Sequence, residues 1–274
     1  MLLTRPHQSI LFVALFLVAI SLSFTSVKAS EFDRFSRHNS DAEAVINHDF
    51  WDLFLEKYVY KATNGVNFVD YNLAKTESLD GLNNYLETLS HLDVTKHNKP
   101  EQMAYWINLY NALTVKTVLD AYPVESIKEI DGGFFNRGPW KDKRITVMEL
   151  ELSLDDIEHQ ILRAFHTDPR IHYAVNCASI GCPDLAMSAY KGVILERQLT
   201  QSAEAFINHP RGVEVEDGEL FLSSIFSWYA DDFGDDEKEI IDHIRQFANP
   251  DLKASLVAIE EISDYDYNWQ INGR

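Results

Sequence analysis

The residues best suited to chemistry lie in one short stretch, "RIHYAVNCASIGCPDL", residues 170–185. It contains both cysteines of the chain, Cys177 and Cys182, and places His172 five residues before the first of them. A cysteine attacks as its thiolate, and a neighbouring imidazole lowers the pKa of the thiol enough to populate that form. The stretch therefore predicts a thiol site in which Cys177 is the nucleophile and His172 takes and returns the proton.

Such a site also needs a third group that orients the imidazole, and two residues nearby offer one. Glu158 and His159 lie on a predicted helix at residues 153–166, before the segment that carries His172. That segment is β-branched and aromatic, which predicts a strand, so His172 and Asn176 would share one of its faces. Glu158 or Asn176 would then orient His172, and His159 is a candidate binding residue.

Three further polar residues are candidates for holding a ligand. Asn108 and Asn111 lie three residues apart on one face of a predicted buried helix, residues 99–123,. Asparagine is costly to bury without hydrogen-bond partners. Asn111 would help to hold an oxyanion and Asn108 would bind substrate; alternatively, both amides tie the helix to neighbouring loops. Arg170, which begins the cysteine-bearing stretch, is the third candidate binding residue.

The cysteine pair has other interpretations, which the sequence leaves open. In an exported protein, Cys177 and Cys182 favour a disulfide, which would close a short loop and add on the order of 2 kcal/mol of stability. A redox pair or a metal site is less favoured, because thioredoxin-like cysteines are separated by two residues and zinc needs a fuller ligand set. We therefore predict no metal and no cofactor.

The N-terminal residues predict export. Residues 1–29 contain an early basic residue, Arg5, then an apolar run of about 15 residues, and small residues at Val27 and Ala29 before the expected cleavage point, which is the layout of a secretory signal peptide,. The apolar run is short for a membrane span, which needs about 20 residues. We expect a periplasmic or secreted protein that is not in the membrane after cleavage.

The charge balance argues against nucleic acid as a partner. The chain has 24 basic and 43 acidic side chains, a formal net charge of −19, and nucleic-acid binding depends on cations that neutralise phosphates. The acidic run "DDFGDD", residues 231–236, lacks the alternating ligands and terminal glutamate of an EF-hand loop,. A soluble acidic surface is the simplest interpretation.

The elements that must position the candidate residues indicate an α+β chain. Residues 30–42 are expected to be a flexible lead-in, and residues 43–274 one domain. Hydrophobic spacing predicts helices over residues 41–60, 78–92, 99–123, 153–166, 196–208, 224–233 and 237–248. Strands are expected over residues 143–153, 170–175 and 262–272, and a type I′ hairpin around Asp217-Gly218. This irregular interleaving of helices and strands defines the class as α+β.

Several ordered motifs resemble the family called domain of unknown function 547. They are "YWINLYNALTVK", "SLDDIEHQILR", "RIHYAVNCASIGCPDL", "SIFSWYADDFG" and the terminal "DYDYNWQIN", and the likeness covers residues 95–235 and the C-terminal strand. The resemblance implies a relationship to papain-like cysteine peptidases and γ-glutamylcysteine transpeptidases. It implies a central helix packed on an antiparallel sheet, in a papain-like or transglutaminase-like architecture, with a thiol site in the cleft.

The order of the residues departs from the papain-like arrangement, in which the nucleophilic cysteine opens the central helix and the histidine follows. Here the helix has no cysteine, and both cysteines follow His172. The first functional hypothesis is a thiol-dependent hydrolase or an acyl or γ-glutamyl transferase that acts on small peptides. The second is a non-catalytic periplasmic module that binds a peptide or a thiol-containing ligand, with Cys177 and Cys182 joined as a disulfide. The sequence does not define an oligomeric state.

Overall fold

The predicted central helix is present as α3, Lys99–Ala121. Asn98 caps it by accepting a hydrogen bond from the backbone N–H of Glu101 at 3.0 Å, and Pro100 occupies its first turn, where no N–H partner is needed,. Nearly every residue from Glu101 to Leu119 is buried. The structure, a computed structural model, describes residues 30–130 and 138–273, so the expected signal peptide lies outside the described residues.

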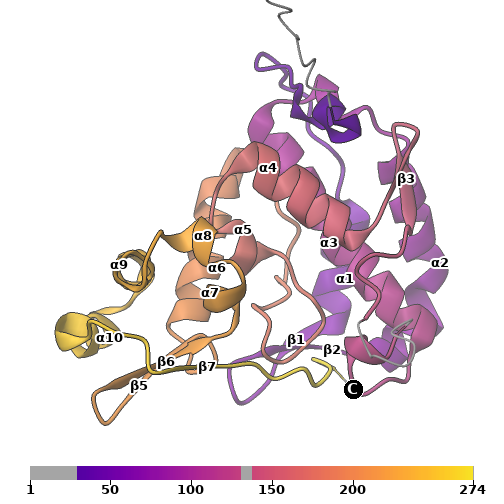
Figure 1. Cartoon of the computed structure of the whole chain (residues 1–274). Coiled ribbons are helices and arrows are strands. Elements are labelled where there is room, and N and C mark those ends of the chain that lie inside the picture. The colour runs from indigo at the N-terminus through magenta and orange to yellow at the C-terminus, as the bar shows by residue number, and fades with distance from the viewer. Residues whose placement is uncertain (1–29, 131–137, 274) are drawn as a thin grey trace, which may run out of the picture. The chain divides into compact units, whose positions relative to one another are not determined.

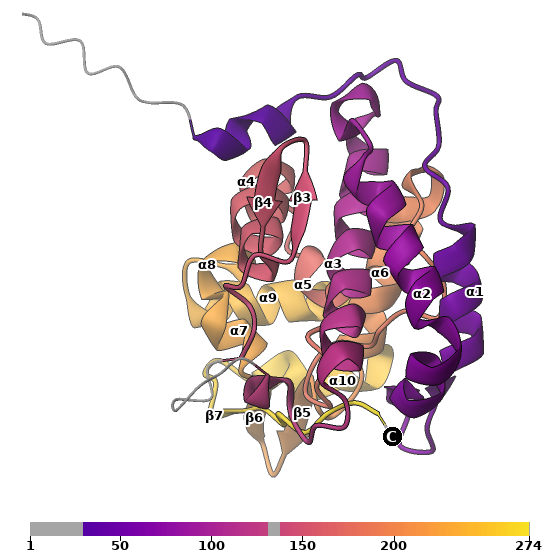
Figure 2. The ribbon, with the colours of Figure 1, turned by 90° about the vertical axis from the view of Figure 1, so that its right-hand side faces the viewer.

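Helix α2, Tyr71–Ser90, packs against α3, and helix α1, Asp49–Tyr58, packs against α2 (Figure 2). Helix α1 is shorter than the helix predicted over residues 41–60, and it buries Trp51, Phe54, Leu55 and Tyr58. Val45, before the helix, and Leu53, on its outer face, are 66% and 65% exposed.

The last two residues of the predicted first helix, Val59 and Tyr60, lie in a strand. This strand, β1 (Val59–Lys61), pairs antiparallel with β2 (Asn67–Val69). Short 3₁₀ turns connect the helical elements at Glu31–Ser36, Val94–Lys96, Ile127–Glu129, Gly192–Ile194 and Leu256–Ala258. Within the expected lead-in, Phe35 is buried and its ring lies 5.0 Å from that of Trp106. This contact joins the residues before α1 to the central helix.

The strand predicted at residues 143–153 is a hairpin instead. Strands β3 (Ile145–Val147) and β4 (Leu150–Leu152) pair antiparallel with a two-residue turn between them. The turn residues, Met148 and Glu149, have φ angles of 48° and 67°, in the region that glycine and asparagine usually occupy. No turn was predicted at this point because neither residue is a typical turn former.

Replacing Glu149 with glycine is expected to raise the free energy of unfolding by about 0.5–1 kcal/mol, because glycine adopts a positive φ without the steric cost that a side chain incurs. Glu149 is exposed, so little packing is lost. Urea unfolding monitored by circular dichroism measures the change. A matched substitution at exposed Glu151, within β4, should destabilise instead, and stabilisation by both variants would contradict the argument.

The C-terminal part of the chain has its own hydrophobic cluster. Its sheet contains β5 (Val213–Glu216), β6 (Glu219–Ser223) and β7 (Asp264–Asp266), and β7 runs parallel to β6 (Figure 1). The predicted hairpin is confirmed, because Asp217 and Gly218 between β5 and β6 both have positive φ angles. The helices that follow are α7 (Ile225–Trp228), α8 (Ala230–Phe233), α9 (Glu237–Phe247) and α10 (Pro250–Ser255).

The segment predicted as the strand that carries His172 is a helical turn, α5, Ile171–Ala174. The strand prediction was wrong because the turn lets this short segment reach both hydrophobic clusters. Ile171 packs in the larger hydrophobic cluster, which contains residues of α1, α2 and α3. Tyr173 packs in the C-terminal cluster. His172 and Asn176 therefore do not share one face of a strand, as had been predicted. Helix α5 leads directly into the loop that carries the cysteines.

The fold is a mixture of helices and small sheets, which is consistent with the α+β class. Helix α6, Leu195–Ile207, packs against α5 and α9. Among the described residues, α3 packs mainly against α2 and the helical segments that begin at Asp156 and Gly192, so the expected packing of the central helix on an antiparallel sheet is not confirmed. Among the described residues, no helix has both the length and the apolar character needed to cross a membrane.

Candidate thiol site in an aromatic cavity

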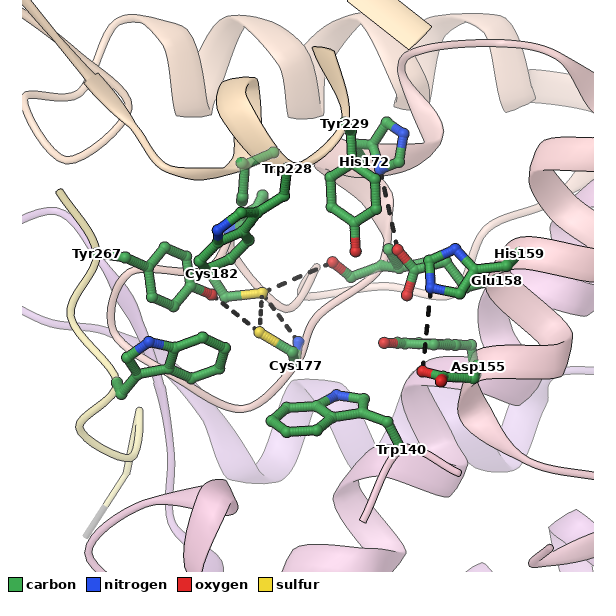
Figure 3. A pocket seen from close by; sticks show the side chains of 15 residues that line it. Trp140, Asp155, Glu158, His159, His172, Cys177, Cys182, Trp228, Tyr229 and Tyr267 are labelled. Atoms are coloured by element: carbon green, nitrogen blue, oxygen red, sulfur yellow. Dashed lines mark hydrogen bonds and ion pairs between the residues drawn. The ribbon is translucent and has the colours of Figure 1, made fainter. Parts of the chain in front are cut away.

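A cavity of about 190 Å³ contains both cysteines and several of the residues singled out from the sequence (Figure 3). Its walls combine six aromatic side chains with two carboxylates, two imidazoles and two thiols. The lining residues are Tyr110, Trp140, Asp155, Glu158, His159, His172, Val175, Cys177, Cys182, Pro183, Ile225, Trp228, Tyr229, Tyr267 and Trp269. Enclosed pockets in which a few polar groups converge among aromatic walls are the usual sites of small ligands.

The acidic wall of the cavity comes from a π-helix. The predicted helix at residues 153–166 consists of η5, Asp156–Leu162, and α4, Arg163–His166. Its start is capped as predicted, with Ser153 Oγ accepting from the backbone N–H of Asp156 at 3.2 Å. The wider π-turn is a local distortion that often occurs at functional sites. In this one, Glu158 is only 5% exposed and faces the cavity across from the cysteines (Figure 3).

The cysteine loop is held by two buried asparagines. Asn111 on α3 donates to the carbonyl of Ala174 at 2.9 Å and accepts from the backbone N–H of Asn176 at 2.8 Å. The side chain of Asn176 accepts from the N–H of Ala178 and donates to the carbonyl of Pro183. These contacts fix the backbone on both sides of Cys177. Neither amide contacts His172, so Asn176 does not take the orienting role considered for it. Asn111 instead ties the helix to a neighbouring loop, which was the alternative considered for the asparagines of α3.

The two cysteines are free thiols, so the disulfide considered from the sequence is not present. Their sulfur atoms lie 2.9 Å apart and are hydrogen bonded. Cys182 Sγ also accepts from the backbone N–H of Cys177 at 2.9 Å. The tight loop therefore brings the sulfurs together through hydrogen bonds rather than a covalent bond. Cys182 is buried, whereas Cys177 is partly accessible at the cavity wall.

The surroundings of Cys177 favour its thiolate. The Cys182 thiol, Ser179 Oγ at 3.4 Å and the Tyr267 hydroxyl at 2.9 Å all contact its sulfur. The hydrogen bond between the two sulfurs contributes most to lowering the pKa of Cys177 below its usual value, against the opposing effect of burial. Burial, and then the neighbouring Cys177, raise the pKa of Cys182 well above its usual value. The pair therefore contains one activated thiol and one that stays protonated.

His172 lines the same cavity but does not contact Cys177. Within the part of the chain that the structure describes, its Nε2 is bonded to Asp232 Oδ2 at 2.6 Å, and its ring stacks on Tyr229 with centroids 4.0 Å apart. Its buried Nδ1 has no hydrogen-bond partner and lies 4.0 Å from Glu158 Oε1. The structure therefore brings His172 together with Glu158, as expected, and separates both from direct contact with the nucleophile.

Asp232 orients His172, and the sequence analysis missed it. Both of its carboxylate oxygens also accept from Arg163, at 2.5 Å and 3.0 Å. Burial alone would raise the pKa of Asp232, but the hydrogen bonds from His172 and Arg163 outweigh it and hold the pKa below its usual range. Asp232 lies in the family-like motif "SIFSWYADDFG" and in the acidic run "DDFGDD", and neither pattern indicated a contact with His172.

The remaining candidates lie in different places. His159 lines the cavity, where Nδ1 accepts from Arg163 at 3.1 Å and Nε2 lies 4.0 Å from Asp155. Asn108 is buried on α3 and exchanges two hydrogen bonds with the backbone of Tyr190, away from the cavity lining. Arg170 pairs with Asp168 and Glu196 and is not among the cavity-lining residues.

No group of three or more His, Cys, Asp or Glu side chains in residues 30–130 and 138–273 has the geometry to hold a metal ion. The groups that line the cavity are a thiol with a lowered pKa, two carboxylates and an imidazole paired with a carboxylate. These groups surround one small space with mostly aromatic walls.

One segment of the chain is similar to a known protein family. Residues 94–207 match the family model described as "Protein of unknown function, DUF547". No curated protein matches the chain, and no solved structure matches it. The family resemblance is confirmed over this segment, and the relationship to papain-like cysteine peptidases gains no support. The match includes both cysteines but ends before Asp232 and Tyr267, so the residues that orient His172 and contact Cys177 lie beyond it.

Proposed function

We propose that this protein is a thiol-dependent acyl-transfer enzyme, a hydrolase or an acyl or γ-glutamyl transferase, that acts on small peptide-like substrates with Cys177 as its nucleophile. The observation that carries the proposal is the position of Cys177. Cys177 is partly exposed and lines a small cavity, and three hydrogen-bonding groups, from Cys182, Ser179 and Tyr267, favour its thiolate. A thiolate that is already populated needs no imidazole in contact with it.

In the proposed reaction, the thiolate of Cys177 attacks the carbonyl carbon of the substrate, and the π-electron pair moves to the carbonyl oxygen. Collapse of this tetrahedral species breaks the bond to the leaving group and forms a thioester on Cys177. Water then attacks the thioester in hydrolysis, or an amine in transfer, and the thiolate is released.

The leaving group needs a proton, which we assign to the pair formed by Glu158 and His172. Glu158 faces the cavity opposite the cysteines, and His172 Nδ1 lies 4.0 Å behind one of its oxygens. Asp232 holds the other nitrogen of His172 and so fixes which nitrogen faces Glu158. One proton shared by this pair is given to the leaving group and is recovered from the attacking water or amine.

Alkylation of the purified protein with iodoacetamide tests the nucleophile directly, because Cys177 and Cys182 are the only cysteines of the chain. Intact mass across a pH series should show a single fast label at Cys177, with a midpoint below about 8.5, the ordinary thiol pKa. With p-nitrophenyl acetate, one equivalent of p-nitrophenolate should be released rapidly per chain. Cys177→Ala should lose both signals and keep the thermal unfolding of the parent.

Two variants serve as controls for the cause of the activation. Cys182→Ala and Tyr267→Phe each remove a hydrogen bond to the thiolate, so each should move the midpoint of labelling to higher pH,. Cys182→Ala should give the larger shift, because this contact contributes most to the lowered pKa. Labelling only above pH 8.5 in the parent, or an unchanged burst in Cys177→Ala, would rule out the proposed nucleophile.

A further inference from the structure

The cavity carries more negative than positive charge. Asp155 and Glu158 contribute two carboxylates, and no lysine or arginine side chain is among the described residues that line it. His159 Nδ1 accepts a hydrogen bond from Arg163, whose guanidinium itself is not among the lining residues,. A Cys177 thiolate adds a further negative charge to the two carboxylates.

Among the described residues, the carboxylate of Asp155 forms no ion pair closer than the one with His159 Nε2, at 4.0 Å. Burial raises the pKa of Asp155 above its usual value. The backbone N–H of Asp155 donates to the carbonyl of Trp140 at 2.9 Å. This bond holds the carboxylate beside an aromatic wall of the cavity (Figure 3). A half-buried carboxylate next to an indole is a favourable place for a positive charge.

The aromatic walls suit the same ligand. Three of the five tryptophans of the chain line the cavity. Trp228 stacks on Trp269 with centroids 5.4 Å apart, and Trp140 meets Trp269 edge to face at 5.7 Å. Rings in this group already contact cations, as Lys128 lies 4.7 Å from the ring of Trp269. The negative faces of tryptophan and tyrosine rings are the groups that proteins use to bind organic ammonium ions.

We propose that the substrate of this site carries a small organic cation, an ammonium group, which is held by Asp155 and the indoles of Trp140 and Trp228 while its acyl carbonyl faces Cys177. This inference rests on the proposed thiol-dependent function and adds the substrate class to it. The cavity, at about 190 Å³, accommodates a compact substrate. The excess negative charge would disfavour an anionic group in the same place.

Three methanethiosulfonate reagents that differ in charge test the inference on the full chain. They carry a trimethylammonioethyl, a methyl or a sulfonatoethyl group. In each, the Cys177 thiolate attacks the sulfenyl sulfur, the bond to the sulfonyl sulfur breaks, and methanesulfinate leaves. Released sulfinate counts this first attack even if Cys182 then displaces the adduct. For each thiol, the rate with the cationic reagent is divided by the rate with the anionic reagent. We expect this ratio to be about tenfold larger at Cys177 than at a surface thiol.

A thiol on the surface shows how much the net negative charge of the whole protein changes the rates of the charged reagents. Val193 is 82% exposed and does not line the cavity, so Val193→Cys in a Cys177→Ala, Cys182→Ala background reports the general field. Raising NaCl to about 0.5 M should reduce the ratio at this surface thiol more than the ratio at Cys177, because screening is weaker for partly buried charges. Asp155→Asn should lower the ratio at Cys177 by about threefold or more.

The outcomes separate the two proposals. Fast reaction of Cys177 with all three reagents, at the ratio of the surface thiol, would overturn the cationic substrate class and leave the thiol nucleophile intact. Slow reaction with all three would overturn the nucleophile itself. An unchanged ratio in Asp155→Asn would remove that carboxylate from the binding of the cation, and with it the arrangement proposed here.

Discussion

Replacing Asp232 with alanine is expected to lower the free energy of unfolding by about 2–3 kcal/mol, because the change leaves His172 and Arg163 without their shared acceptor,. His172 is buried, so its Nε2 cannot turn to water. Breaking a fully buried ion pair costs about 3–5 kcal/mol. The expected loss here is smaller, because the Asp232 side chain is 27% exposed. Urea unfolding at pH 7 measures the difference.

The same carboxylate predicts an acid-dependent part of the stability. The pKa of Asp232 is lower in the folded protein than in the unfolded chain, where it is about 3.9,. Its contribution is therefore complete above roughly pH 4–5 and is lost as the pH falls through the unfolded value towards the folded one. The alanine variant should differ most from the parent near neutral pH and should approach it in strong acid.

Asp231 offers a matched control for Asp232. It is the neighbouring residue on α8 and is exposed, so Asp231→Ala should change stability by less than about 0.5 kcal/mol. The free energy of unfolding of Asp232→Asn should fall between those of Asp231→Ala and Asp232→Ala, since asparagine keeps a hydrogen-bond acceptor and loses the charge. Equal stability of the Asp231 and Asp232 variants would contradict the assigned role of Asp232. So would a difference that persists unchanged in strong acid.

Local sequence signals were sufficient where the residues that determine an element lie within that element. Asn98, Pro100 and an apolar circumference define α3, and Asp217-Gly218 defines the β5–β6 hairpin. These patterns work because capping, ring geometry and positive φ act within a few residues. They do not depend on what packs against the element.

The sequence was misleading where packing decided the local structure. The residues of α5 have the composition of a strand, but a helical turn directs Ile171 and Tyr173 into different hydrophobic clusters. Tertiary burial overrides a weak local propensity in a segment of four residues. The Met148-Glu149 turn was hidden for a related reason, because strand pairing imposes a φ that these residues do not favour by themselves.

The candidate site was predictable only in its local part. The pairing of Cys177 with Cys182 and of Glu158 with His172 involves residues close in sequence, and the structure brings both pairs to one cavity. Tyr267 reaches Cys177 from 90 residues away, and Asp232 reaches His172 from 60 residues away. No spacing rule links such residues, because their proximity is set by the packing of the C-terminal cluster against α5.

Asn111→Ala is expected to have the largest effect on stability, a loss of about 3–4 kcal/mol, because it strands two buried backbone groups that each cost about 1–3 kcal/mol when unpaired. The side chain is 2% exposed and serves both the Ala174 carbonyl and the Asn176 N–H. Asn111→Asp should be at least as harmful, since it loses the donor to Ala174 and buries a charge in its place. Urea unfolding again measures the loss.

Asn108→Ala distinguishes a positioning role from a general one. Asn108 has the same burial and makes the same pair of backbone hydrogen bonds, but to Tyr190 rather than to the cysteine loop. Both variants should lose similar stability, whereas only Asn111→Ala should move the pH midpoint of Cys177 alkylation, measured where both variants remain folded. Asn111 holds the residue before Cys177, so releasing it loosens the contact of that sulfur with Cys182. An equal shift, or none, in the two variants would show that Asn111 stabilises the fold without positioning the thiol.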